Sequence, residues 1–305
     1  MVDRAKNWQA VTEDIAMSEQ VKVFIPEFHA LRGWAWWQKR TKLLNGTAEG
    51  FYSQNGQDYR LVAATGIPPE TVMAAIDEHQ RLCRDGGLLK NDKKRRLSKV
   101  EVGGRGLIVK EYRHLSRWGV FSPDQRSWLG ANRLSGACPC LAWLRFQGNN
   151  AYLLFPQVGE EDLFFQDKSQ YRPFARELFR GVAGILARLH SARIYHADCK
   201  SSNFVCHRQD DGNFRLSLID CDDVRCPCCL SPHMRAKNLA QFLGLESKIR
   251  DLEIRRNLTL EFLRDYAELS GLGLPTVAAM LPEIQKLACQ LYPDQEEILR
   301  QILRR

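Results

Sequence analysis

The chain has 305 residues, of which 44% are hydrophobic and 26% are charged. These values are typical of a globular protein with one large domain or two lobes, and they exclude a disordered chain. The net charge of +8 and the pI near 9.0 favour an anionic partner. Nucleic acid, an anionic membrane surface and an acidic glycolipid all fit, and composition does not distinguish them.

The chain contains no run of about eighteen apolar residues, and residues 1–6 lack the apolar stretch of a signal peptide. We therefore expect a cytosolic protein whose ten cysteines remain thiols. Cysteines cluster at residues 138–140 (Cys-Pro-Cys) and 226–229 (Cys-Pro-Cys-Cys). These C-x-C pairs lack the C-x₂-C spacing typical of zinc sites, so the sequence leaves metal binding there open.

Residues 1–80 are predicted to form an amino-terminal extension. Its suggested role is contact with a membrane. Residues 21–25 are predicted to form a short strand, and Asn55-Gly56 predicts a hairpin. Residues 32–42 combine three tryptophans with four cations, a composition that favours the membrane interface. The alternative is that these tryptophans pack against the rest of the protein.

Residues 81–157 are predicted to form a small lobe, entered by a helix that starts at Pro68-Pro69. Three antiparallel strands are expected at residues 88–90, 97–102 and 106–112, with Lys110 ending a β-branched apolar run. The turn before the second strand has no glycine and carries four cations, Lys93, Lys94, Arg95 and Arg96. They could bind the phosphates of a nucleotide or an anionic acceptor, and the alternative is a solvated basic turn.

Ser122-Pro123 predicts the start of a helix that lies against the Lys110 strand. This helix has no Glu to pair with Lys110, so Gln125, Asn132 or Asp124 would have to take that role. Two further strands are predicted at residues 140–146 and 151–155, followed by a hinge at residues 156–159.

Residues 158–305 are predicted to form a mostly helical lobe. Its first long helix has one apolar face, made by Phe174, Leu178, Val182, Ile185, Leu186 and Leu189. Further helices are predicted at residues 234–245, 248–269, 276–288 and 294–303.

A polar loop after the first long helix of this lobe carries Asp198, Lys200 and Asn203, and a hairpin then leads to Asp220. The order H-x-D-x-K-x-x-N, hairpin and Asp is the layout of a kinase active site. Asp198 would accept the proton of a substrate hydroxyl, Lys200 would meet the γ-phosphate, and Asn203 and Asp220 would bind Mg²⁺ through hard oxygen atoms. The alternative, a loop of turn-forming residues, does not explain the second aspartate.

The remaining residues of a predicted ATP site come from the small lobe and the hinge. Lys110 would pair with the α- and β-phosphates. The backbone next to Phe155 and Val158 would bind adenine, and Lys93 and Arg95 would contact phosphates.

Six segments resemble the lipopolysaccharide core kinase (Kdo/WaaP) family, and the resemblance covers residues 88–245. They are residues 88–90, 107–110, 126–128, 196–203, 219–225 and 235–239. The resemblance implies a protein-kinase-like fold and phosphorylation of a heptose or Kdo sugar of the lipopolysaccharide inner core. It also implies the use of ATP and Mg²⁺ at the cytoplasmic face of the bacterial inner membrane.

Three departures from protein kinases bear on the substrate. Ala197 stands where many protein kinases have Arg, Cys221-Asp222 replaces Phe-Gly, and no Ala-Pro-Glu segment follows. These differences disfavour regulation by a phosphorylated activation loop and an ordinary protein substrate.

We therefore predict an α+β, bilobal protein-kinase-like fold, with an antiparallel sheet lobe, a mostly helical lobe and an amino-terminal extension. The predicted function is an ATP-dependent kinase of a lipopolysaccharide or lipid A-core acceptor, peripheral to the membrane, with no nucleic-acid partner. A protein or small-molecule kinase is one alternative. A pseudokinase that binds a membrane partner is the other, supported by the missing Glu and glycine-rich loop.

Overall fold

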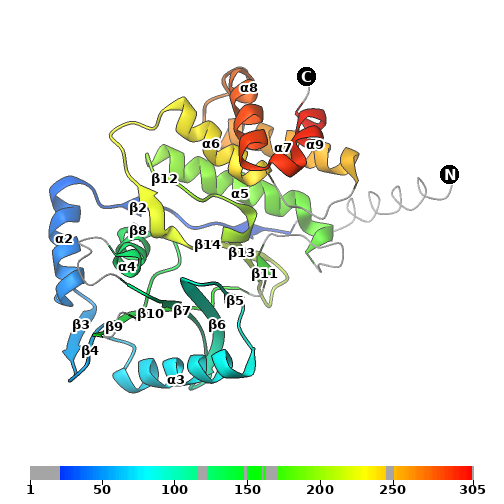
Figure 1. The fold of residues 1–305 in the computed structure, drawn as a ribbon. Helices are drawn as coiled ribbons and strands as arrows, with labels where there is room; N and C mark the ends of the chain where they lie inside the picture. Colours follow the sequence, from blue (N-terminus) through cyan, green and yellow to red (C-terminus); the bar gives the residue numbers. More distant parts are fainter. Residues whose placement is uncertain are drawn as a thin grey trace.

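The computed structural model describes residues 21–115, 122–147, 150–159, 161–162, 171–244 and 251–303. These residues form two lobes, one built on a β-sheet and the other built mainly of helices (Figure 1).

The small lobe contains a seven-stranded antiparallel sheet with the strand order β3-β4-β9-β10-β7-β6-β5. Its strands are β3 Phe51–Asn55, β4 Tyr59–Ala64, β5 Lys90–Asn91, β6 Arg95–Val102, β7 Arg105–Tyr112, β9 Ala142–Phe146 and β10 Ala151–Pro156. The tight β6–β7 turn is Gly103-Gly104, and both glycines have positive φ, 58° and 73°, as a type I′ hairpin requires. The hairpins and strands that the sequence predicted for this region are therefore confirmed.

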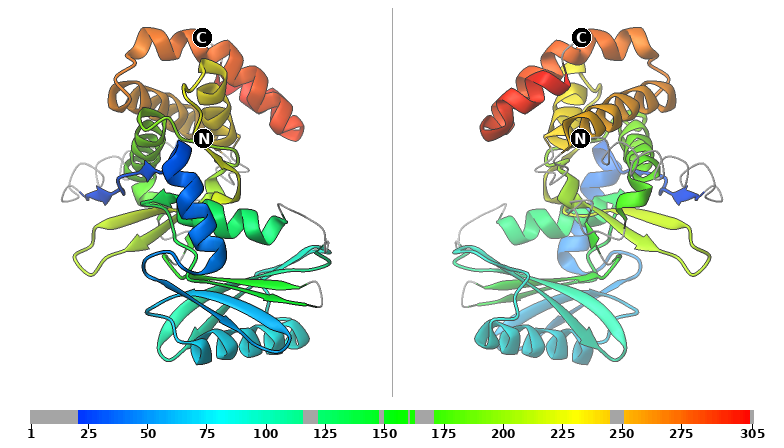
Figure 2. Two further views of the ribbon diagram at one scale, coloured as in Figure 1. Left: turned by 90° about the vertical axis from the view of Figure 1, so that its left-hand side faces the viewer. Right: turned by 90° about the vertical axis from the view of Figure 1, so that its right-hand side faces the viewer.

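The two faces of this sheet are covered differently. On the outer face, helix α3 (Pro69–Asp85) buries Val72 and Ile76 against Leu107 and Val109 of β7. On the inner face, helices α2 (Gly33–Asn45) and α4 (Pro123–Arg133) pack with the sheet in a second cluster, which includes Leu43, Trp128, Tyr112, Trp143 and Leu153. Figure 2 shows α3 on the side of the sheet away from the helical lobe. Residues that alternate along β7 therefore point either to α3 or towards the other lobe.

The small lobe begins earlier in the chain than the sequence suggested. The predicted boundary at residue 80 falls inside α3 and assigns β3 and β4 to an extension, but β4 pairs with β9 of the same sheet, with Leu61 opposite Leu144. Sheet pairing is long-range in the sequence, so strand periodicity alone did not reveal that this hairpin continues the sheet.

The segment before α2 lies along the helical lobe. Strand β1 (Val23–Phe24) pairs in parallel with β14 (Phe214–Leu218), and β2 (His29–Ala30) pairs with β8 (Leu134–Ser135). A Cβ added to Gly181 of helix α5 (Ala175–Ser191) would lie 2.7 Å from Val23 Cγ1, so the glycine permits this close packing. Residues 21–45 therefore contact both lobes.

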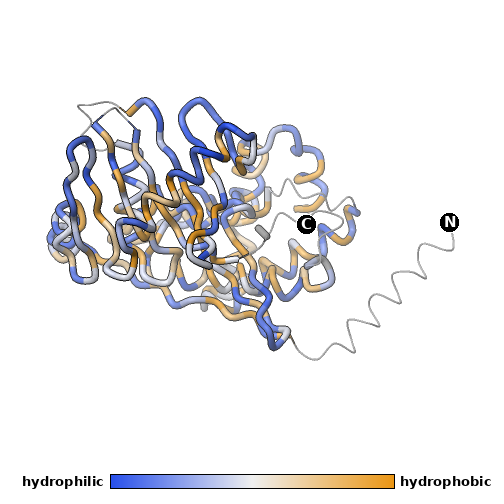
Figure 3. The backbone as a smooth tube through the Cα atoms, turned by 90° about the horizontal axis from the view of Figure 1, so that it is seen from below, coloured by the Kyte–Doolittle hydropathy of each residue, from blue (hydrophilic) through white to orange (hydrophobic). Residues whose placement is uncertain are grey.

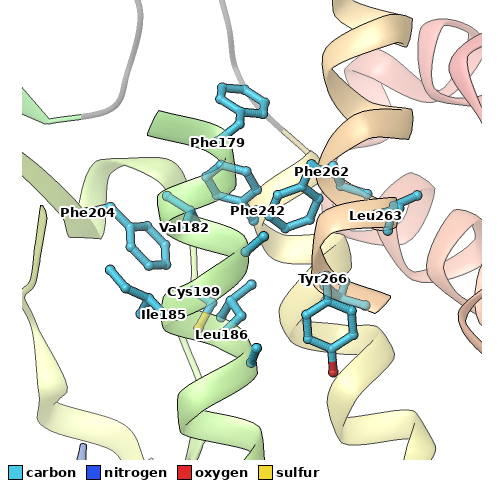
Figure 4. Packing of buried hydrophobic residues seen from close by; sticks show 14 of the residues in the cluster. Phe179, Val182, Ile185, Leu186, Cys199, Phe204, Phe242, Phe262, Leu263 and Tyr266 are labelled. Atoms are coloured by element: carbon cyan, nitrogen blue, oxygen red, sulfur yellow. The ribbon is translucent and has the colours of Figure 1, made fainter. Parts of the chain in front are cut away.

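The helical lobe is organised around α5 (Ala175–Ser191), whose predicted apolar face is buried. Phe179 of α5, Phe242 and Phe262 pack together in its core, with ring centroids 5.2 Å apart for the edge-to-face pair Phe179–Phe242 and 4.7 Å apart for the tilted pair Phe242–Phe262 (Figure 4). The other helices are α6 Pro232–Leu243, α7 Leu252–Leu269, α8 Leu274–Leu291 and α9 Glu296–Ile302, with short 3₁₀ turns at Arg172–Phe174 and Pro293–Gln295. Among the helices in the described ranges, none is long and apolar enough to cross a membrane.

The strands after β10 belong to two small sheets, one with the order β1-β14-β13-β11 and one in which β12 pairs with β15. They are β11 Glu161–Asp162, β12 Tyr195–His196, β13 Phe204–Arg208, β14 Phe214–Leu218 and β15 Val224–Arg225. Apolar segments run through the interior and hydrophilic turns lie at the periphery (Figure 3). The two lobes, the antiparallel sheet and the mostly helical second lobe confirm the predicted protein-kinase-like fold.

Candidate active site

The β13–β14 hairpin brings Asn203 and Asp220 to the same end of two paired strands. Phe204 pairs with Leu218, and the amide of Ile219 donates to the carbonyl of Asn203 at 2.9 Å. Asn203 therefore directly precedes the hairpin and Asp220 directly follows it. The structure thus joins two residues that are 17 positions apart in the sequence (220 − 203).

Asp198 lies beside both of its predicted companions in the loop. Its Oδ2 accepts from Lys200 Nζ at 2.7 Å and from Asn203 Nδ2 at 3.1 Å. The Asn203 amide nitrogen also donates to the Asp198 carbonyl at 2.7 Å. These bonds use the nitrogen of Asn203, so its amide oxygen remains the atom suited to a hard cation.

Lys110 reaches from β7 of the small lobe to two carboxylates of the other lobe. Its Nζ lies 2.8 Å from Asp220 Oδ1 and 2.7 Å from Asp222 Oδ2. Burial alone would lower the pKa of Lys110, but the charges of Asp222 and Asp220 raise it well above its usual value. Lys110 is therefore a permanent cation at the junction of the lobes.

Asp220 occupies an unusual backbone conformation and is strongly ionised. Its φ of 58° and ψ of 51° place it in the left-handed region, directly before the 3₁₀ turn Cys221–Asp223. Burial would raise its pKa, but the charge and hydrogen bond of Lys110, with Asp222 and His196, lower it to about 2. A metal ion would therefore meet a carboxylate that is already deprotonated at neutral pH.

Asp222 is the partner of Lys110 that the sequence did not identify. The sequence proposed Gln125, Asn132 or Asp124 in place of the missing Glu, and this prediction is wrong. Asp124 accepts from Trp143 Nε1 at 2.9 Å, and Asn132 donates to the Trp128 carbonyl at 3.0 Å.

Helix α4 acts on Lys110 indirectly, through Asp222. Ser127 Oγ of α4 donates to Asp222 Oδ1 at 2.6 Å, and Tyr112 OH donates to Asp222 Oδ2 at 2.9 Å. The sequence feature that could have identified the partner of Lys110 is Asp222 itself, which lies two residues after the expected metal ligand Asp220.

Polar side chains of α6 hydrogen-bond to the backbone of the loop that carries Asp198. Asn238 Nδ2 donates to the His196 carbonyl, Gln241 Nε2 donates to the Ala197 carbonyl, and Gln241 Oε1 accepts from the Cys199 amide at 3.2 Å. Asn238 and Gln241 are buried, and sequence reasoning assigned them no role. Their spacing of three residues on a helix, among apolar neighbours, is the signal that could have found them.

Two buried histidines complete this support. His196 Nδ1 accepts from the Asp198 amide at 3.2 Å, and burial lowers the pKa of His196, so it supports the loop as a neutral ring. His190 Nε2 contacts Asn238 Oδ1 at 3.1 Å and its Nδ1 contacts Tyr266 OH at 2.7 Å. Burial lowers the pKa of His190 to about 3, so this network carries no charge near neutral pH.

The predicted ATP contacts outside the Asp198 loop lie on the inner face of the small-lobe sheet or at the ends of its strands. Phe155 pairs with Ile108 and therefore lies on the same face as Lys110, where it packs against the inner cluster. Val158 follows in the hinge, where Gln157 N donates to the Gly106 carbonyl at 3.0 Å. Because that amide is used within the chain, adenine binding would fall to Val158.

The basic turn between β5 and β6 divides between the two faces. Arg95 pairs with Tyr112 and shares the inner face with Lys110, whereas Arg96 pairs with Glu111 on the outer face. Lys93 is exposed in the turn, where Asp92 Oδ1 accepts from the amides of Lys94 and Arg95. Lys93 and Arg95 therefore stay predicted phosphate contacts, while Arg96 points away from the junction of the lobes.

A lysine on the sheet of one lobe, paired with an aspartate that follows a hairpin of the other, defines a protein-kinase-like site. The sequence model described as "Lipopolysaccharide kinase (Kdo/WaaP) family" matches residues 162–287. The matched residues include Asp198, Lys200, Asn203 and Asp220. The helical lobe is thus similar to this family of kinases.

Solved structures are also similar to this chain. One is described as WaaP in complex with acyl carrier protein, with 24% identity and a TM-score of 0.49, covering 76% of this chain and 99% of that chain. Another is the Mycobacterium tuberculosis PknI kinase domain, with 15% identity and a TM-score of 0.37, covering 65% of this chain and 93% of that chain. No curated protein sequence matches.

Proposed function

We propose that this protein transfers the γ-phosphoryl group of ATP to a hydroxyl of a heptose or Kdo sugar of the lipopolysaccharide inner core. The observation that carries the proposal is the pairing of Lys110 Nζ with Asp220 and Asp222 at 2.8 and 2.7 Å. It brings Lys110, the predicted phosphate contact of one lobe, to Asp220, the predicted metal ligand of the other. The family match over residues 162–287 supports lipopolysaccharide as the acceptor.

Asp198 is the general base in this proposal. Its side chain is 44% exposed, so a substrate hydroxyl can approach it. Lys200 and Asn203 donate to Oδ2, which orients the carboxylate. Lys200, whose side chain is 46% exposed, can also meet the transferred phosphoryl group.

Asn203 and Asp220 would hold Mg²⁺, since they present an amide oxygen and an ionised carboxylate at the same end of the hairpin. Bound Mg²⁺ would neutralise the negative charge of the phosphates during transfer. Lys110 contributes a fixed positive charge beside the same carboxylate. The complete set of base, metal ligands and lysine disfavours a non-catalytic pseudokinase.

Transfer of label from radiolabelled ATP tests this function. The purified protein with Mg²⁺ is incubated with membranes, soluble metabolites and total protein of a lysate in separate reactions. We expect label in lipopolysaccharide, and mass spectrometry of lipopolysaccharide from cells lacking this protein should show the loss of a phosphate. Label in protein or in a soluble metabolite would instead support the alternative kinase functions, and no label in any fraction would support the pseudokinase.

We further propose that helix α2 brings the protein to an anionic membrane surface. Trp34 is 71% exposed and Trp37 is 53% exposed, whereas Trp36 lies under the guanidinium of Arg133 at 4.9 Å. The two alternatives for this stretch thus apply to different tryptophans, since Trp36 packs against the protein and the other two face outward.

The charge of α2 complements an anionic surface. Residues 28–48 contain Arg32, Lys39, Arg40 and Lys42 and no acidic residue. Exposed indole rings favour the headgroup region, and each nearby cation adds about 1 kcal/mol of attraction to anionic lipid. This position would place the kinase beside a membrane-embedded acceptor.

Vesicle flotation tests the membrane contact. The wild type should float with vesicles that contain phosphatidylglycerol, less with neutral vesicles, and less as salt is raised. Replacing Trp34 and Trp37 by Ala should reduce flotation, while the matched change of exposed Leu269 and Leu291 to Ala should not. Equal flotation of both variants would contradict the role of α2.

A further inference from the structure

A cluster of three potential metal ligands lies on the outer face of the small lobe, away from the candidate active site. His79 and Cys83 are one turn apart on α3, and Glu111 is on β7. His79 Nε2, Cys83 Sγ and a carboxylate oxygen of Glu111 all lie within 4.8 Å of one another. In the ranges that the structure describes, this is the only group of at least three such residues, so the cysteines at 138–140 and 226–229 form none.

Two distances in this cluster match the edges of a tetrahedral metal site. His79 Nε2 lies 3.5 Å from Cys83 Sγ and 3.5 Å from Glu111 Oε2. Tetrahedral zinc with ordinary bond lengths separates N and S ligands by about 3.6 Å, and N and O ligands by about 3.4 Å. A charge-assisted hydrogen bond between His79 and Glu111 would be shorter, at about 2.7 to 2.9 Å.

The second ring nitrogen of His79 is already held in the manner of a metal ligand. His79 Nδ1 lies 2.7 Å from Ser98 Oγ, and both side chains are fully buried. A ligating histidine uses this second contact to fix its ring orientation, with the lone pair of the other nitrogen directed at the ion. The remaining oxygen of Glu111 accepts from Tyr152 OH at 3.3 Å, which orients the carboxylate.

One cation competes for the same carboxylate. Arg96 Nη1 lies 3.7 Å from Glu111 Oε2, and the Arg96 side chain is 28% exposed. A metal ion would displace this guanidinium towards solvent. Removing Arg96 should therefore strengthen metal binding, whereas in a purely hydrogen-bonded cluster it would have no such effect.

We propose that His79, Cys83 and Glu111 bind a divalent transition-metal ion, zinc being the best match to one nitrogen, one sulfur and one carboxylate ligand. The ion would join α3 to the strand that carries Lys110. It is independent of the Mg²⁺ expected at Asn203 and Asp220, because Glu111 points to the opposite face of β7 from Lys110.

Cobalt and zinc titrations of the full-length protein test the site. With Co²⁺, the wild type should show a thiolate-to-cobalt charge-transfer band and tetrahedral d–d bands at one equivalent. With Zn²⁺, its melting temperature should rise. Cys83→Ser should lose the charge-transfer band and bind zinc at least about 100-fold more weakly.

Two further variants make the outcome specific. Arg96→Ala should bind zinc about tenfold more tightly or better. Cys289→Ser, which changes a half-buried cysteine on α8, should bind as the wild type does. The proposal is overturned if the wild type shows no thiolate-to-cobalt band. It is also overturned if Cys83→Ser, with the same metal-free melting temperature as the wild type, still shows that band.

Discussion

Lys110 and Glu111 are neighbours on β7, are 6% and 4% exposed, and lie on opposite faces of the sheet. Lys110 is neutralised by carboxylates of the other lobe, at 2.8 and 2.7 Å. Glu111 instead finds its partners within its own lobe, where the cation Arg96 lies 3.7 Å away and a ring nitrogen of His79 lies 3.5 Å away. The inner charge therefore depends on how the lobes meet, and the outer charge depends on how α3 covers the sheet.

This difference indicates which buried charges serve catalysis. A buried charge costs free energy unless it is paired, so each face must supply its own partners. On the inner face the partners are Asp220, which is the proposed metal ligand, and Asp222, and their bonds to Lys110 cross between the lobes. Changes on the inner face should therefore alter activity, and changes on the outer face should alter stability or metal binding alone.

The largest expected effect is on the inner side, at the base. Asp198→Asn removes the proton acceptor but keeps hydrogen-bonding atoms for Lys200 and Asn203. We expect phosphoryl transfer to fall by about 10²- to 10⁴-fold with little change in melting temperature. Asp210→Asn, in the exposed turn of the hairpin, is the matched control and should keep full activity. Near-normal transfer by Asp198→Asn would remove Asp198 from the mechanism.

Lys110→Met tests the charge pair on the inner face through the pH dependence of folding stability. The folded pKa of Asp220 is about 2, below its unfolded value of 3.8, so its stabilisation is present above pH 4 and is lost as pH falls towards 2. This contribution is about 2 kcal/mol at neutral pH in the wild type and depends on Lys110.

Urea unfolding of Lys110→Met at pH 6 and pH 3 measures this contribution. The variant should lose less stability between the two pH values than the wild type does. Lys99→Met, an exposed change on β6, should follow the wild type. The same pH dependence in all three proteins would show that the inner pair contributes no linked stability.

On the outer face, Glu111→Gln should lower stability and leave catalysis nearly unchanged. The amide keeps the bond from Tyr152 but removes the negative charge that faces His79 and Arg96. The expected loss is about 1 to 2 kcal/mol in the free energy of unfolding. A large loss of kcat with normal stability would contradict the division between the faces.

The smallest expected effect is that of replacing two fully buried serines, one on each face of the sheet. Ser127 Oγ lies 2.6 Å from Asp222 Oδ1, and Ser98 Oγ lies 2.7 Å from His79 Nδ1. Replacing each serine by Ala should cost about 1 kcal/mol of stability. Only Ser127→Ala should also lower kcat/KM, by about five- to tenfold, since Asp222 then holds Lys110 less firmly. Equal activities would show that α4 does not position Lys110.

Local sequence patterns predicted much of this molecule because they reflect local physics. The order of Asp198, Asn203, a hairpin and Asp220 predicted which residues the hairpin would join, since strand pairing over a short turn is local. The apolar period of α5 likewise predicted its buried face. The contacts of Lys93, Arg95 and Val158 with ATP remain predictions.

Long-range contacts were the part that the sequence did not reveal. The pairing of Lys110 with Asp222 joins residues 112 positions apart, and the support of Ala197 by Gln241 joins residues 44 apart. No periodicity encodes such contacts, because they depend on how whole elements pack. The assignment of β3 and β4 to an extension was wrong for the same reason, since β4 pairs with β9 about 80 residues later in the chain.

The parallel pairing of β1 with β14 has a practical consequence for anyone who shortens this protein. A fragment that begins at the recognisable kinase segments, near residue 88, would leave the backbone of β14 without its neighbour. An uncovered strand edge is a template for intermolecular pairing, so such a fragment should self-associate. It would also lose the guanidinium of Arg32, which at 2.8 Å donates to the Pro227 carbonyl. Residues 21–45 therefore shield the β13–β14 hairpin from pairing with other chains, in addition to the membrane contact proposed for α2.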